Sequence, residues 1–281
     1  MPGHPSSQLA RNARRVRGWQ MWVIVVIFSL GSLQPASATL LTVPNPHAEV
    51  TNQRRANGNA CGPACLINSL SYGSEKWQNV LVGQAGTNSR TRIYGLIARY
   101  GKQPSHHLQG NHPRWNPNAG INILDLTDIA NEMNAGRWLP KIKNQILNRQ
   151  ARETNSQLLK RSHKLMVASM KKGYPPTISL SRYAYQHSQI VNKVTWSPVR
   201  SHFVMIYEIP TSLPRNATSF KVRYIDPWGG LLHTGTIHAQ SNAFTQSPFL
   251  IADFPNTSAG KNLLKADTKT VLTLAGIIGA F

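Results

Sequence analysis

The spacing of apolar residues changes once along the chain, near Pro175 and Pro176. Before this point, apolar residues recur at the interval of an amphipathic helix, in residues 64–70, 74–82, 91–100, 118–135 and 155–172. After it, short runs rich in β-branched and aromatic residues predict strands, at 177–180, 201–209, 221–226 and 249–252. Helices followed by strands predict an α+β fold, with N-terminal helices packed on a C-terminal antiparallel sheet. The apolar segment 270–281 is expected to be a last packed element, either strand or helix.

Residues 1–38 have the organisation of a signal peptide. Four arginines, at 11, 14, 15 and 17, precede the apolar run 21–30, and Ala36-Ser37-Ala38 follows as a small-residue cleavage site. The apolar run is shorter than the roughly 20 residues of a spanning helix, so we predict cleavage and no membrane span after it. An uncleaved anchor is the alternative. We therefore assign 1–38 to a signal peptide and 39–281 to the mature domain, in a secreted or periplasmic protein.

The charge of the chain is strongly unbalanced. It has 31 Lys and Arg against 10 Asp and Glu, a formal net charge of +21. Such a field attracts anionic surfaces, such as a cell envelope, acidic lipids or nucleic acid, without indicating a reaction. The sequence has no phosphate-binding loop and no dinucleotide fingerprint, so we predict no cofactor and do not expect a nucleic-acid partner.

The two cysteines, Cys61 and Cys65, lie on one short element. Positions four apart on a helix give poor disulfide geometry, and a disulfide-stabilised domain would spread its cysteines over distant segments. Three histidines at 106, 107 and 112 lie in a predicted loop with no carboxylate among them, and we expect them to be exposed. No metal site is predicted.

Residues 59–70 place Cys61 where a loop meets a predicted helix. The backbone N–H groups and the positive end of the helix dipole favour a thiolate, so we expect a Cys61 pKa below the roughly 8.5 of a free cysteine. The same N–H groups can stabilise the oxyanion of an acyl-transfer intermediate. Alone, this pattern also fits a small buried cysteine.

Two predicted strands each carry one polar residue at an end. His202 begins the first, and Asp226 ends the second. An antiparallel pairing that sets Ile209 against Ser219 or Phe220 would bring His202 within a residue or two of Asp226. An imidazole oriented by a carboxylate is the base that a thiol nucleophile needs. Taken singly, a structural histidine and a turn-forming aspartate remain the alternatives.

Three motifs occur in order: NACGPACL at 59–66, SHFVMI at 201–206 and YIDPWGG at 224–230. Together with the helix-to-strand step KGYPPTI at 172–178, they resemble the papain-like cysteine peptidases of the bacteriocin-processing type, the double-glycine leader peptidases and their stand-alone secreted relatives. The resemblance covers about residues 50–230. It implies a papain-like fold, a peptide or protein substrate, Cys61 as nucleophile, His202 as base and Asp226 as the orienting acid.

That family also uses a glutamine as oxyanion donor about six residues before the cysteine, where this chain has Arg55. Gln53 is the nearest candidate, with Asn57-Gly58 as a small insertion, and Asn59 is the alternative. We therefore expect a secreted or periplasmic cysteine peptidase. The alternative is an inactive papain-like module that binds an anionic cell-envelope or nucleic-acid partner through its basic surface.

Overall fold

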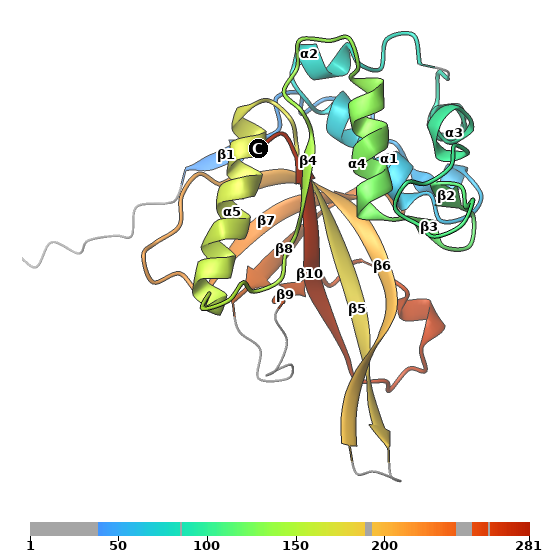
Figure 1. Ribbon diagram of the computed structural model, residues 1–281. Helices are drawn as coiled ribbons and strands as arrows, with labels where there is room; N and C mark the ends of the chain where they lie inside the picture. The colour runs from blue at the N-terminus through green and yellow to red at the C-terminus, as the bar shows by residue number, and fades with distance from the viewer. Residues whose placement is uncertain (1–38, 85, 189–192, 240–248, 258) are drawn as a thin grey trace, which may run out of the picture. The chain divides into compact units, whose positions relative to one another are not determined.

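The computed structural model describes residues 39–281 except 85, 189–192, 240–248 and 258 (Figure 1). The predicted signal peptide, residues 1–38, lies outside the described residues. Among the helices that are described, none is both long and apolar enough to cross a membrane.

Six antiparallel strands form a closed barrel at the centre of the fold (Figure 1). Their order is β6-β5-β10-β9-β8-β7, and β7 pairs with β6 to close the ring. Two further strands add to this sheet, β1 on β6 and β4 on β10. The eight strands are β1 (Leu40–Thr42), β4 (Lys143–Ile146), β5 (Thr177–Ser188), β6 (Lys193–Pro210), β7 (Ser219–Asp226), β8 (Leu231–His238), β9 (Leu250–Asp253) and β10 (Thr270–Gly279).

The predicted papain-like α+β fold, with N-terminal helices packed on a C-terminal antiparallel sheet, is wrong, because the sheet closes into a barrel. The four predicted strands correspond to β5, β6, β7 and β9, but closing the barrel requires β8 and β10 as well. The central strand β10 pairs with β4, β5 and β9. It is buried on both faces, so its sequence is mostly apolar and has no period that distinguishes a strand from a helix.

The predicted helices are confirmed, with shifts of a few residues at their ends. They are α1 (Cys61–Ser71), α2 (Glu75–Gln78), α3 (Ser89–Leu96), continued by the π-helix η2 (Ile97–Gly101), α4 (Ile123–Met133) and α5 (Asn155–Lys171). Short elements complete the described chain: the 3-10 helices η1 (Gln53–Arg55) and η4 (Lys261–Leu263), and a two-stranded sheet of β2 (Trp115–Asn116) and β3 (Gly120–Ile121).

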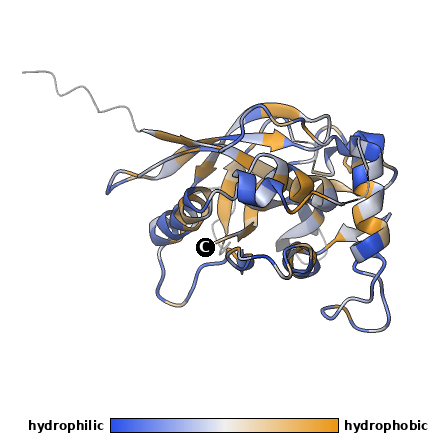
Figure 2. Ribbon diagram, turned by 90° about the horizontal axis from the view of Figure 1, so that it is seen from above, coloured by the Kyte–Doolittle hydropathy of each residue, from blue (hydrophilic) through white to orange (hydrophobic). Residues whose placement is uncertain are grey.

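The apolar residues form two buried clusters. One fills the barrel and extends to α5, and the other lies between α1, α3 and α4. Figure 2 shows the hydrophobic colour concentrated on the strands, while the helices are mixed. Phe203 of β6 belongs to the helical cluster, so the residue beside His202 joins the barrel to the helices. This contact packs α1 against the barrel.

Candidate active site

Cys61 is the first residue of α1, and Ala60 is its N-cap. Every residue of α1 is buried, so the helix position is fixed by packing. The next residue must be small, because a Cβ on Gly62 would lie 2.4 Å from Ile121 Cγ2. The thiol therefore lies at a helix N-terminus, as the sequence predicted, and the structure shows that the start of this helix packs against β3 and β6.

His202 and Asp226 approach each other where β6 pairs with β7, the seam that closes the barrel. The predicted register is wrong, because Glu208 pairs with Arg223, so Ile209 does not lie opposite Ser219 or Phe220. β6 and β7 instead pair Met205 with Ile225, with a bulge between Ile206 and Glu208. The register differs from the predicted one by only a few residues, and the two polar residues still meet at the end of the seam.

The carboxylate of Asp226 is fully engaged. Its Oδ1 accepts hydrogen bonds from His202 Nε2 at 2.7 Å and from the backbone N–H of Trp228 at 2.8 Å. Its Oδ2 accepts one from Thr257 Oγ1 at 2.9 Å. Asp226 is 1% exposed and Thr257 2%, so little water competes for either oxygen.

The His202 imidazole lies between this carboxylate and the Cys61 thiol. Because Nε2 is bonded to Asp226, the other ring nitrogen is left for the hydrogen bond to Cys61. Burial alone would lower the pKa of His202, but hydrogen bonds to Asp226 and Cys61 and their charges raise it to about 10. The structure therefore brings the three predicted residues together in the predicted order.

The pKa of Cys61 is lowered despite its burial. Burial raises the thiol pKa, and the hydrogen bond and charge of His202, with the backbone N–H groups of Phe203 and Gly62, outweigh it. The lowered pKa of Cys61 and the raised pKa of His202 both favour a thiolate beside an imidazolium over the neutral pair. Cys65 differs, because burial and the nearby Cys61 and Asp226 charges raise its pKa well above that of a free thiol.

Gln53 lies in η1 and is tied to the turn that follows Asp226. Its backbone N–H donates to Pro227 O at 2.9 Å. The side-chain amide of Asn52 also pairs with the backbone of Gly229, through bonds of 3.1 and 3.2 Å. The turn needs glycine at 230, where φ is +71° and a Cβ would lie 2.4 Å from Val50 Cγ1.

The Gln53 side chain is buried and lines the same cleft as Cys61, and its Oε1 has no hydrogen-bond partner. Arg55 is exposed and does not line this cleft. Asn59 does line it, but its amide donates to Asn118 O and accepts from Arg200. Gln53 is therefore the better placed candidate for the oxyanion donor, because no hydrogen bond among the described residues engages its side-chain amide.

Thr257 was not found from the sequence. It follows β9, outside the segment that resembles the peptidase family, and no motif marks it. Its loop is held by the buried Arg182, whose Nε donates to Ala259 O at 3.2 Å. Ala259 and Gly260 line the cleft, so this C-terminal loop supplies both a partner for Asp226 and part of the wall.

The cleft has a volume of about 750 Å³. It lies between β5 and β6 on one side and residues 108–123 on the other. Cys61, His202, Gln53 and the half-exposed Trp228 all line it. A cleft of this size is large enough for several residues of an extended peptide.

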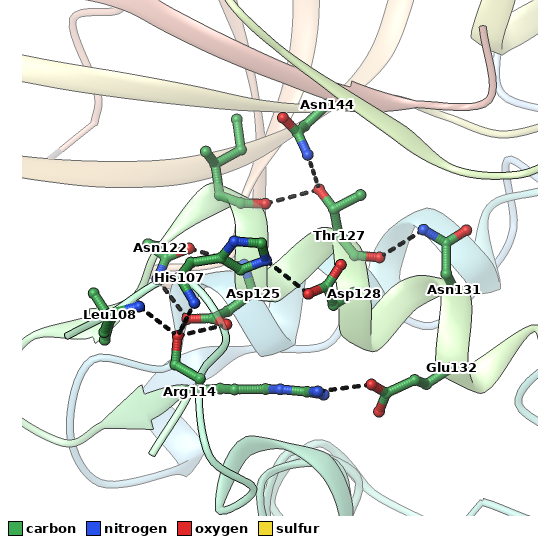
Figure 3. Close-up of polar contacts among 12 residues, drawn as sticks. His107, Leu108, Arg114, Asn122, Asp125, Thr127, Asp128, Asn131, Glu132 and Asn144 are labelled. Carbon is green, nitrogen blue, oxygen red and sulfur yellow. Dashed lines mark hydrogen bonds and ion pairs between the residues drawn. The ribbon is translucent and has the colours of Figure 1, made fainter. Parts of the chain in front are cut away.

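A second polar cluster anchors the far wall of the cleft to α4 (Figure 3). His107 Nε2 bonds Asp128 Oδ2 at 2.8 Å, and Arg114 Nη2 pairs with Glu132 at 2.8 Å. Ser105 Oγ donates to both oxygens of Asp125, at 2.9 and 2.8 Å. The loop histidines His106, His107 and His112 are exposed, as predicted, and α4 supplies to His107 the carboxylate that the loop itself lacks.

His107, Asp125 and Asp128 offer ligand atoms within 4.8 Å of one another. Asp125, however, is already saturated by Ser105 and by Asn122, and the positive charge of Arg114 lies close to both carboxylates. These contacts explain the cluster as a structural anchor, and we assign it no metal.

Neither a known family model nor a curated protein matches this chain. The likeness to cysteine peptidases therefore rests on the three motifs and on the arrangement of the residues within them.

Proposed function

We propose that this protein is a cysteine peptidase that hydrolyses a peptide or amide bond through a thioester intermediate. The observation that carries the proposal is the position of His202, bonded to Asp226 at 2.7 Å and to the Cys61 thiol at the edge of an open cleft. A histidine held between a buried carboxylate and a thiol at a helix N-terminus is the arrangement that activates a cysteine nucleophile.

In acylation, the Cys61 thiolate attacks the carbonyl carbon and forms a C–S bond, and the carbonyl oxygen becomes an oxyanion. The Gln53 amide and the backbone N–H groups at the start of α1 are the proposed donors to that oxygen. The C–N bond then breaks while the His202 imidazolium gives its proton to the leaving amine. In deacylation, His202 takes a proton from water, the hydroxide attacks the thioester, and the C–S bond breaks to restore the thiolate.

The location and partners follow from the N-terminal pattern and the charge. We place the enzyme outside the cytoplasm, secreted or periplasmic, with a peptide or protein substrate and contact with an anionic cell envelope. The basic surface supports association, and the cleft supports the reaction.

The test is digestion of a peptide library by the wild type, by Cys61→Ala and by the matched control Cys65→Ala. We expect turnover by the wild type and by Cys65→Ala, and none by Cys61→Ala. In parallel, iodoacetamide should label Cys61 rapidly at pH values well below the ordinary thiol pKa of about 8.5. No turnover, combined with labelling that rises only near that pKa, would instead favour an inactive binding module.

A further inference from the structure

Among the described residues, the cleft around Cys61 is lined by arginines and by no acidic side chain. The chain's 10 acidic residues all lie in the described part, since the sequence has none at 1–38, 85, 189–192, 240–248 or 258. None of them lines the cleft, whereas Arg114 and Arg200 do. The nearest acid is Asp226, which is buried and bonded to His202, Trp228 and Thr257.

Arg200 is the cation best placed to meet a substrate. It lies on β6 two residues before His202, it is exposed, and its Nη1 donates to Asn59 Oδ1 at 3.1 Å. Its stem packs against Gly260, where a Cβ would lie 2.7 Å from Arg200 Cβ. Among the described acids none pairs with Arg200, so its charge is held in place and left uncompensated.

The other cations near the cleft are engaged. Arg114 is buried and pairs with Glu132. Arg54 lies over the Trp228 ring, 5.0 Å from its centroid, at the cleft edge. Both add to the positive field, but of the two arginines that line the cleft Arg200 is the exposed one, and its planar guanidinium can bind a carboxylate in a two-point geometry.

We infer that the cleft selects acidic peptides, with a substrate carboxylate bound by Arg200 close to the scissile bond. The inference rests on the proposed function and adds the substrate class to it. Arg200 is then a specificity residue, which contacts the substrate and takes no part in the bond changes.

Charged and neutral alkylating agents test this without any peptidase activity. Iodoacetate and iodoacetamide react alike: the thiolate attacks the CH₂ carbon, a C–S bond forms and iodide leaves. Only iodoacetate carries a carboxylate. We measure the ratio of their labelling rates at Cys61 in the wild type, Arg200→Gln, Arg200→Lys and Arg215→Gln, in which an exposed arginine outside the cleft makes the same charge change.

We expect the iodoacetate preference to fall up to about fivefold in Arg200→Gln, the size of an exposed ion pair. Arg200→Lys should keep most of it, and Arg215→Gln all of it. An unchanged ratio in Arg200→Gln, or an equal fall in Arg215→Gln, would overturn the inference, the second because a general field would then suffice.

A cleaved peptide from the library allows the matching substrate test. Each glutamine in it is replaced by glutamate, one at a time, and kcat/KM is compared between the wild type and Arg200→Gln. One position should show a glutamate preference that Arg200→Gln removes, and no such position would count against Arg200 as a specificity residue. If no peptide is cleaved but the alkylation ratio falls as expected, the proposed function fails and the charge selectivity of the cleft stands.

Discussion

Replacing Thr257 with valine tests how firmly Asp226 is held. Valine has nearly the shape of threonine but no hydroxyl, so the change removes the 2.9 Å bond to Asp226 Oδ2 without leaving a cavity. That oxygen is buried and has no other partner among the described contacts. Losing a hydrogen bond to a charged group costs about 1.5–3 kcal/mol, and we expect the free energy of unfolding to fall by that amount.

The effect on the reaction depends on the hydrogen bonds that Asp226 keeps in this variant. The bonds from His202 and from the Trp228 N–H still hold Oδ1, so the carboxylate stays near the imidazole but can turn. If the whole loss appeared in the transition state, the rate would fall about 10- to 150-fold. Because the Oδ1 bonds persist, we expect the lower end, about tenfold in kcat. KM should change little, since Thr257 does not line the cleft.

Three measurements separate orientation from general damage. Urea unfolding gives the stability, peptide hydrolysis gives kcat and KM, and the pH profile of Cys61 labelling reports the thiolate. The profile should move to higher pH, because a less oriented His202 stabilises the thiolate less. Thr257→Ser keeps the hydroxyl and should restore all three, and Thr218→Val is the exposed control. If Thr257→Ser is as defective as Thr257→Val, the methyl packing matters and the hydrogen bond does not.

The remaining predictions concern the other site residues and the surface charge. Cys61→Ser should abolish turnover, whereas Cys65→Ala should mainly reduce stability, by about 1 kcal/mol for a small buried group; an inactive but folded Cys65→Ala protein would contradict this assignment. Asp226→Asn keeps a hydrogen-bonding group and should leave measurable turnover, but His202→Ala removes the proton carrier and should leave almost none; similar losses in both would show that the carboxylate does more than orient the ring. Raising the salt concentration should weaken binding to anionic envelope material or acidic peptides, because salt screens exposed charges over roughly 8 Å at physiological strength; a constant affinity would exclude a role for the basic surface.

The parts of the molecule that the sequence predicted are those fixed by local patterns. The helix that begins at Cys61 follows from the apolar spacing of the residues after it, a pattern that acts within a few residues. The meeting of His202 and Asp226 followed from two strand ends on a hairpin. The two residues meet despite the wrong register, because the observed pairing of β6 with β7 differs from the predicted one by only a few residues.

The barrel and Thr257 depend on contacts between distant segments. β10 is buried on both faces, so the spacing of its apolar residues does not indicate a strand. Thr257 contacts a residue 31 positions earlier in the chain, and a lone threonine in a loop carries no signal of that contact. Gln53 could be predicted only in part. The resemblance indicated a glutamine before the cysteine, but not the backbone hydrogen bond to Pro227 that fixes its position.

The seam that closes the barrel is also where the site forms. β5 and β6 pair over their whole shared length, whereas β6 and β7 pair only from Met205 to Glu208, so this seam has few backbone bonds. The bonds of Asp226 to His202 and Thr257 lie at its end and join β6, β7 and the loop after β9. We therefore expect Asp226→Ala to quicken amide hydrogen exchange at residues 205–206 and 224–225 more than on β5, because local opening follows the weakest set of contacts. Unchanged exchange at the seam would mean that closure is independent of the site. Faster exchange there would mean that the contacts which orient His202 also hold the barrel closed.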